Sequence, residues 1–269
     1  NTLMKCFAQA KQPDRCFHLY DDLRLLGLEP SDVTLGILLD ACVDAGDHDQ
    51  ARQVFNDMRG SGFKLNAVHF TTFMKGLVSA GQLTEAMDVF EAMLASDETK
   101  PDLVTYSTLV KAHADHGNVT DAIHVLERMM KQGIAPDAVI FNIVLTGCCV
   151  KPMEAKQIFH VFQWLTNKGL RVSTSTLSIL VKALAKSCAW DAALDMLEKA
   201  PERLQLWPEA RLYGQLAQAC VQCGDASKAV DAYALMVRAA ARQGVGVDKA
   251  SNARLLRLCS SCGGSDKAF

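Results

Sequence analysis

Two Cys-x-x-Cys pairs have the spacing that most directly suggests metal chemistry. They are Cys220 with Cys223 and Cys259 with Cys262, in a chain of 269 residues that contains ten cysteines. Four thiolates at this spacing form a common zinc-ligand set. The alternative is that these cysteines are small apolar side chains packed inside the protein. The pattern of the surrounding sequence favours the second interpretation, packed side chains.

Other patterns of catalytic residues do not occur in the sequence. It contains no nucleophile signature, no glycine-rich phosphate loop and no carboxylate cluster of the kind used by metal-dependent nucleases. We therefore predict no catalytic residue, no metal ion and no cofactor here, and no enzyme activity from these residues. We also expect no membrane helix, since no run reaches the ~18 apolar residues that one needs.

A motif of about 35 residues recurs along the whole chain. Leu103–Asp137 reads LVTYSTLVKAHADHGNVTDAIHVLERMMKQGIAPD, and the two preceding segments repeat its pattern. One such unit cannot bury its own apolar face and must stack on its neighbours. We predict a single array with the repeats 1–31 (partial), 32–66, 67–102, 103–137, 138–173, 174–209, 210–248 and 249–269 (partial). Both ends fall within repeats, so we expect a piece of a longer array.

Each repeat is expected to form two amphipathic helices. In 103–137 the apolar spacing predicts helices over about 105–116 and 121–132. Gly117 and Asn118 separate them, Gly133 suits a helix end, and Pro136 prevents continuation. The predicted fold is an all-α, right-handed superhelical solenoid of helix-turn-helix repeats, with the first helices along the concave face.

The repeat alignment also gives the cysteines a structural role. Cys220 and Cys259 share one position with Cys42, Cys148, Leu77 and Leu184, on the inward side of the first helix. A second recurrent position, in the second helix, holds Ala51, Ala86, Ala122, Ala229 and Ala268. Small side chains there allow the two helices of a hairpin to approach closely. We therefore favour buried, packing cysteines over zinc ligands or disulfides.

The recurring residues resemble the pentatricopeptide repeat, in an array of the P type. The match rests on Val-Thr-Tyr-Ser-Thr-Leu, then Gly, then Ala-Ile-x-Val-Leu, then Met, Gly and Pro-Asp. It covers essentially the whole chain, most strongly 32–137 and most weakly 174–248. The resemblance implies a single-stranded RNA-binding protein of chloroplasts or mitochondria that binds one base per repeat.

In that family, the fifth residue and the last residue of a repeat recognise the base. The resemblance implies guanine for Thr71 with Asp102 and for Ser107 with Asp137, because a carboxylate accepts from the N–H groups of guanine. It implies cytosine for Asn1 with Ser31 and for Asn142 with Ser173. Gly36 with Asn66 suggests a purine, while Ser178 with Glu209 and Gly214 with Asp248 do not fit the common code. The expected RNA core is 5′-C-R-G-G-C, where R is a purine.

The resemblance also assigns the second residue of a repeat to packing against the base from either side. Val33, Val68, Val104 and Val139 occupy this position in four successive repeats, and Ser175, Arg211 and Ala250 follow them. The same polar residues have an ordinary alternative role as helix caps and turn residues. Their recurrence in register with the valines favours RNA contact.

The charge of the chain does not favour tight RNA binding. It has 28 basic and 30 acidic residues, a net charge of −2, whereas nucleic-acid affinity usually depends on neutralising phosphates. The family often has lysine at the thirteenth residue, and only Lys186 conforms. The ninth residue is basic in five repeats, as Lys5, Lys75, Lys111, Lys182 and Arg257. We predict that these residues form a basic stripe along the RNA backbone; isolated solvated lysines are the alternative.

The sequence thus predicts an organellar RNA-binding protein acting in RNA stabilisation, processing, splicing or translation. One alternative is a protein-binding scaffold of an organellar ribosome or another large complex, with protein partners on the C-terminal repeats. A second alternative is the RNA-recognition arm of a larger processing enzyme, whose catalytic domain lies outside these residues.

Overall fold

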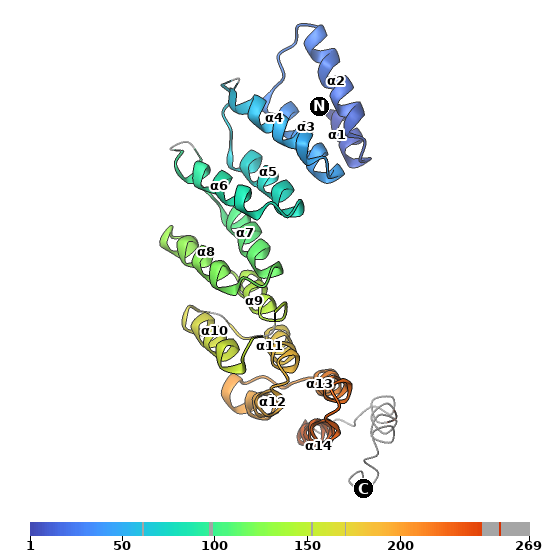
Figure 1. Cartoon of the computed structure of the whole chain (residues 1–269), viewed down its shortest axis with the longest axis vertical. Helices are drawn as coiled ribbons and strands as arrows, with labels where there is room; N and C mark the ends of the chain where they lie inside the picture. The colour runs from blue at the N-terminus through green and yellow to red at the C-terminus, as the bar shows by residue number, and fades with distance from the viewer. Residues whose placement is uncertain (61, 97–98, 152, 170, 244–252, 254–269) are drawn as a thin grey trace. The chain divides into compact units, whose positions relative to one another are not determined.

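The computed structural model describes residues 1–60, 62–96, 99–151, 153–169, 171–243 and 253. Within these residues the chain forms fourteen helices and no strand (Figure 1). The expectation of an all-α protein is confirmed. None of the described helices is long and apolar enough to span a bilayer.

The chain divides into two compact units, each described by itself. The first comprises 1–113 and 120–136, and the second comprises 114–119 together with the residues from 137 onward. The first unit contains most or all of the helices α1 Thr2–Gln9, α2 Pro13–Leu25, α3 Asp32–Ala45, α4 His48–Gly60, α5 Ala67–Ser79, α6 Leu83–Leu94, α7 Leu103–Asp115 and α8 Val119–Lys131. The second contains α9 Ala138–Gly147, α10 Ala155–Asn167, α11 Thr174–Lys186, α12 Trp190–Leu204, α13 Ala210–Gln222 and α14 Ala226–Gln243.

Consecutive helices pair as hairpins, and the first helices of the hairpins stack on one another. In the first unit α1 packs on α2, α3 on α4 and α5 on α6, while α1, α3 and α5 form a continuous row. In the second unit α9, α11 and α13 form the corresponding row, each beside its own second helix. Each unit therefore has a layer of first helices and a layer of second helices.

Glycine and the capping residues determine where the helices begin and end. Gly46, Gly117 and Gly133 follow helix ends with φ of +77°, +68° and +77°, the left-handed region that glycine enters without steric cost. The predicted start of α7 at Thr105 was two residues late. The Asp102 carboxylate accepts the Thr105 N–H, which places Thr105 in the third helical position rather than the first.

The small and apolar positions of the repeat form the core. Ala51, Ala86, Ala122 and Ala229 are at most 2% exposed, as expected of small side chains packed against the partner helix. Ala268 lies outside the described residues. Cys42, Cys148 and Cys220 are at most 1% exposed, and burial raises the pKa of each thiol to about 12.

Aromatic contacts join the second helix of one repeat to the first helix of the next. Phe55 of α4 stacks on Phe73 of α5 with ring centroids 4.3 Å apart. Phe90 of α6 meets Tyr106 of α7 edge to face at 5.3 Å. Phe55 and Phe90 are at most 1% exposed. Burial of this kind stabilises a repeat only when its neighbour is present.

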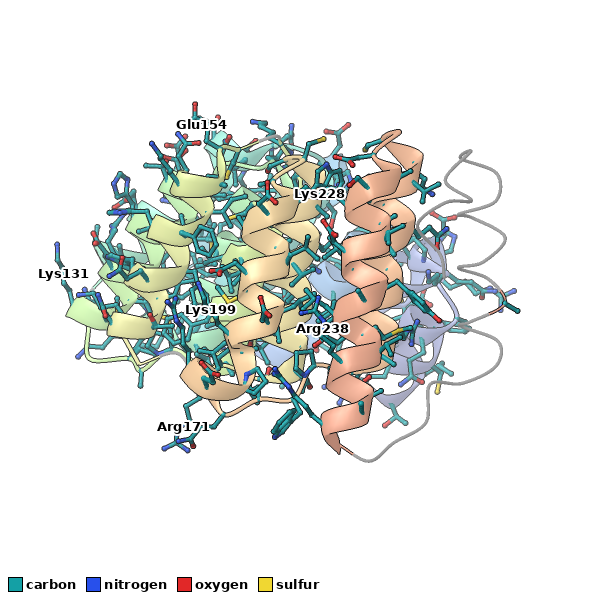
Figure 2. The ribbon with its side chains drawn as sticks, turned by 90° about the horizontal axis from the view of Figure 1, so that it is seen from below. Lys131, Glu154, Arg171, Lys199, Lys228 and Arg238 are labelled. Carbon is teal, nitrogen blue, oxygen red and sulfur yellow. The ribbon has the colours of Figure 1, made fainter. Side chains whose placement is uncertain are left out.

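Ion pairs link successive second helices at the surface. Arg52 binds both oxygens of Glu85 at 2.9 and 2.7 Å, and Arg128 binds both oxygens of Glu91. Exposed arginine pairs of this kind contribute less than about 1 kcal/mol each. Lys228 of α14, labelled in Figure 2, is in the same relation to α12, where it pairs with Asp191. The apolar contacts between repeats therefore dominate the stability.

We predict that Phe90→Ala destabilises the protein by about 3–5 kcal/mol, because it removes a fully buried ring and leaves a cavity beside Tyr106. Urea unfolding measures the change. The matched control Phe90→Leu keeps most of the apolar volume and should cost clearly less. Equal, small effects of both substitutions would contradict a tightly packed inter-repeat contact.

Candidate nucleic-acid interface

In five of the predicted repeats, the last residue caps the first helix of the next repeat through its side chain, whereas Glu209 makes no such bond to α13. Ser31 Oγ accepts the N–H of Thr34 at 3.3 Å, and Ser173 Oγ accepts that of Thr176 at 3.2 Å. Asp102 and Asp137 do the same through Oδ1, each at 2.8 Å. Asn66 Oδ1 accepts two N–H groups, those of Val68 and His69. The capping role foreseen as the alternative is therefore present at every one of these residues.

The fifth residues lie one turn into the first helices, except Asn1, which precedes α1. Gly36, Ser107, Asn142 and Ser178 are half-buried, on α3, α7, α9 and α11 respectively. Thr71 of α5 is only 6% exposed. Little of its surface is therefore open to a ligand.

Three of the predicted base-recognition pairs are joined by a threonine of the following repeat. Thr34 Oγ1 lies 2.8 Å from Asn1 Oδ1 and 2.9 Å from Ser31 Oγ. Thr105 Oγ1 lies 2.8 Å from both Thr71 Oγ1 and Asp102 Oδ1. Thr176 Oγ1 lies 2.9 Å from Asn142 Oδ1 and 3.0 Å from Ser173 Oγ. The structure thus brings the fifth and last residues together in these three repeats.

The other predicted pairs are arranged differently. His69 takes the place of the threonine beside Gly36 and Asn66; its Nδ1 accepts the Asn66 N–H at 3.3 Å. Ser107 donates its hydroxyl to the Val104 carbonyl at 3.0 Å. Ser107 and Asp137 belong to different compact units, so each is described alone.

The predicted base-packing valines are exposed. Val33, Val68, Val104 and Val139 are between 48% and 67% exposed. Val33 and Val68 line a pocket of about 340 Å³ together with Gly36, Asn66 and His69. The residues that line this pocket therefore include the second residue of two repeats, the fifth residue of one and the last residue of one.

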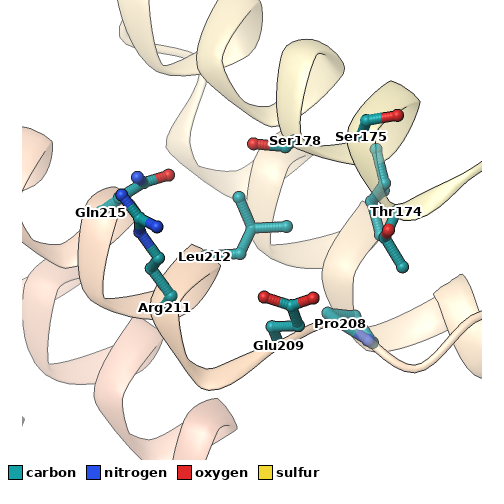
Figure 3. Close-up of a pocket in the computed structure, with 9 residues that line it drawn as sticks. Thr174, Ser175, Ser178, Pro208, Glu209, Arg211, Leu212 and Gln215 are labelled. Atoms are coloured by element: carbon teal, nitrogen blue, oxygen red, sulfur yellow. The ribbon is translucent and has the colours of Figure 1, made fainter.

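A second pocket of about 340 Å³ occupies the equivalent place between α11 and α13 (Figure 3). Ser175 and Ser178 of α11 line one side, and Glu209, Arg211 and Leu212 at the start of α13 line the other. Polar residues replace both valines here. A further pocket of about 320 Å³ lies along the same two helices and includes Lys182.

The predicted phosphate-contacting lysines differ in their surroundings. Lys5, Lys75, Lys111 and Lys182 are exposed on first helices. Lys75 lies near Asp40, whose pKa is raised by burial and by Asp44, while Lys75 opposes that rise. The Lys186 ammonium donates to the Cys149 carbonyl at 2.7 Å, so it holds the turn after α9. Lys131 and Lys199 belong to second helices (Figure 2).

Of the described cysteines, five are buried and three are exposed. Cys220 is buried, and burial raises the pKa of its thiol to about 12. Cys223 is exposed. Within the described ranges no group of three or more His, Cys, Asp or Glu residues is placed to hold a metal ion. Cys259, Cys262, Arg257, Asp248, Ala250 and the last predicted repeat lie outside those ranges.

Thr34, Thr105, Thr176 and His69 were not among the residues predicted from the sequence. All four are the third residue of a repeat and are at most 4% exposed. The available signal was the threonine in Val-Thr-Tyr, which recurs with the repeat. It gave no indication of a bond to the preceding repeat.

Comparison with known families identifies the repeat. Models of the PPR repeat family match residues 1–44, 65–115 and 101–150, and the PPR repeat model matches 33–63. Together these segments cover more than half of the chain. The protein therefore belongs to the pentatricopeptide repeat family, as the resemblance indicated. Among curated proteins, none matches the chain significantly.

Solved structures show the same fold. PPR10 from maize superposes with a TM-score of 0.62 at 20% identity, over 98% of this chain and 47% of that one. PPR10 in complex with an 18-nt psaJ RNA element gives 0.67 at 21% identity, over 97% and 37%. The PPR domain of Arabidopsis thaliana protein-only RNase P 1, in complex with tRNA, gives 0.56 at 19%, over 68% and 95%. The predicted helix-turn-helix repeat fold is confirmed, and the chain spans less than half the length of PPR10.

We predict that stability depends on pH through His69. Burial lowers the pKa of His69 below the ordinary value of about 6.5 that it regains on unfolding. The unfolded state therefore binds more protons, so the stability from neutral His69 is complete above that value and is lost as pH falls through the folded pKa.

Unfolding free energies of the wild type and His69→Gln at pH 7.5 and pH 5 test this. The advantage of the wild type over the variant should shrink at pH 5. The matched control His18→Gln removes an exposed imidazole and corrects for the loss of one such group. A difference between wild type and His69→Gln that is the same at both pH values would contradict the prediction.

Proposed function

We propose that this protein binds single-stranded RNA along its row of first helices, one base per repeat, with the preferred core 5′-C-R-G-G-C. The pocket between α3 and α5 is the observation that carries the proposal. It combines two exposed valines, which can contact both faces of a base, with Gly36 and Asn66 at the base edge. Apolar contact with the faces of a base tolerates any sequence, whereas the edge supplies discrimination.

The complexes of related folds support the choice of ligand. PPR10 has been solved with an RNA element, and the PPR domain of protein-only RNase P 1 with tRNA. A protein bound along an RNA strand can block a nuclease or keep a hairpin unfolded, so this role requires no catalytic residue. We infer a place in organellar RNA stabilisation, processing, splicing or translation. Protein-only RNase P also illustrates a repeat array within an enzyme.

A protein-binding scaffold is the second candidate, and the C-terminal repeats favour it. In the pocket between α11 and α13, Ser175 and Arg211 replace the paired valines, and Glu209 adds a negative charge. The net charge of −2 points the same way. Under this candidate the first unit retains its valine pocket without using it for RNA.

We predict that selection from a random RNA library enriches a G-G step flanked by cytosine. The two hydroxyl–carboxylate pairs, Thr71 with Asp102 and Ser107 with Asp137, supply the guanine preference, since carboxylates accept from guanine N–H groups. Sequencing of the bound RNA at low salt is the measurement. Binding without enrichment, or no binding, would favour the scaffold instead.

The contribution of phosphate contacts is tested by changing Lys75, Lys111 and Lys182 together to Glu. We expect weaker binding of RNA with the predicted core and a shallower salt dependence. Each lost contact to a single strand removes about 0.7 from the slope of log K against log salt. Fluorescence anisotropy titrations at several salt concentrations measure both quantities.

The matched control changes Lys131, Lys156 and Lys168 to Glu, three lysines on or at the end of second helices. It alters the net charge by the same amount but leaves the first-helix row intact. Equal effects of the two triple variants would show that only the total charge affects RNA binding. That result would contradict a basic stripe along the first helices that contacts the phosphates.

A further inference from the structure

The threonine at the third residue of a repeat touches both members of the preceding base-recognition pair. This contact recurs at Thr34, Thr105 and Thr176, in both compact units. Thr105 and Thr176 are fully buried, and Thr34 is 3% exposed. None of the three presents a surface to a ligand, so any effect on recognition must act through the pair.

A threonine hydroxyl has one proton to donate and two lone pairs to accept with. At Thr105 that proton goes to Asp102 Oδ1, because a carboxylate is only an acceptor. The short contact between Thr71 and Thr105 must then be a bond donated by Thr71. Both hydrogen bonds are therefore donated in the same direction: Thr71 donates to Thr105, and Thr105 donates to Asp102.

This direction determines what the pair offers to a base. The Thr71 proton is committed inward, so its hydroxyl presents only lone pairs. Asp102 Oδ1 is occupied by Thr105, and Oδ2 remains as an acceptor. A face made only of acceptors matches the N1–H and N2–H₂ donors of guanine. Adenine presents an acceptor at N1, which cannot form a hydrogen bond with another acceptor.

The same residue produces the opposite polarity beside asparagine. Thr176 donates to Asn142 Oδ1, which commits the carbonyl end of the amide inward and leaves Nδ2 with its two protons. Thr34 does the same to Asn1 Oδ1. An N–H₂ group offered to the base matches the N3 and O2 acceptors of cytosine, whereas uracil has a donor at N3.

We propose that Thr34, Thr105 and Thr176 are positioning residues that set the hydrogen-bond polarity of the preceding base-recognition pair. This inference rests on the proposed RNA-binding function. It adds a third specificity-determining residue to those repeats, located across the repeat boundary. The repeats followed by His69, Ile140 and Leu212 lack this hydroxyl and its control of polarity.

The test replaces one hydroxyl by a methyl group of the same size. In Thr105→Val, the Thr71 proton is released and can be donated to adenine N1. We expect the preference for G over A at the third base of 5′-C-A-G-G-C to fall by about fivefold to tenfold, the effect of one hydrogen bond. Anisotropy titrations with labelled RNAs carrying G or A at that base give the ratio.

Thr176→Val is an independent second variant and a reciprocal control. It frees the Asn142 amide to rotate, so the preference for C over U at the fifth base should fall while that at the third base stays unchanged. Thr105→Val should have the converse pattern. Thr105→Ser keeps the hydroxyl and should restore the preference for G.

A further matched control is Thr108→Val, which removes another α7 hydroxyl that bonds only its own helix, at the Val104 carbonyl. It should leave every preference unchanged. If Thr105→Val weakens the G and A RNAs equally, the residue is merely structural and the inference is overturned. If the wild type binds neither RNA, the proposed function itself has failed, which is a distinct result.

Discussion

The start of each first helix imposes the constraint on which the rest of the structure depends. Its leading N–H groups have no partner within the helix. The last residue of the preceding repeat accepts one of them, as Ser31, Asp102, Asp137 and Ser173 each do. Because the cap precedes the helix, the same side chain also borders the row of first helices. Capping and the proposed base recognition therefore require the same residue types, and our proposal places both roles at one position.

A capping residue has only part of its hydrogen-bonding capacity left for a ligand. Aspartate retains a second oxygen, so Asp102 caps α7 through Oδ1 and keeps Oδ2 as an acceptor. Serine has a single oxygen, and Ser31 already shares it with the backbone and with Thr34. In the proposed Asn–Ser pairs, discrimination would then come mainly from the asparagine. Under the proposal, the two kinds of repeat differ in which member of the pair has free groups to offer a base.

Much of the fold could be predicted from single residues, because glycine, proline and alanine affect the structure at their own positions in the chain. Gly117 and Gly133 end helices as expected, and Ala86 and Ala122 permit the predicted close packing. The site was only partly predictable. The periodicity located Val33, Val68 and the paired residues, but it treats the third residue as ordinary core. The bonds of Thr105 and Thr176 cross a repeat boundary, and the Lys186 bond to Cys149 depends on a neighbouring turn. Such contacts require three-dimensional placement.

The loss of the cap bond, the buried threonine and the paired valines toward the C-terminus can be explained by the same constraint. Glu209 occupies the cap position before α13 without a side-chain cap bond, and Leu212 replaces the buried threonine. Without that hydroxyl nothing commits the Ser178 proton inward, while Ser175 and Arg211 remove the apolar contact with both faces of a base. A pocket with an arginine, a carboxylate and an uncommitted serine suits a partner with charged groups more than a stacked base. The proposed determinants of base selection are thus concentrated before residue 174, where cap, threonine and valine occur together.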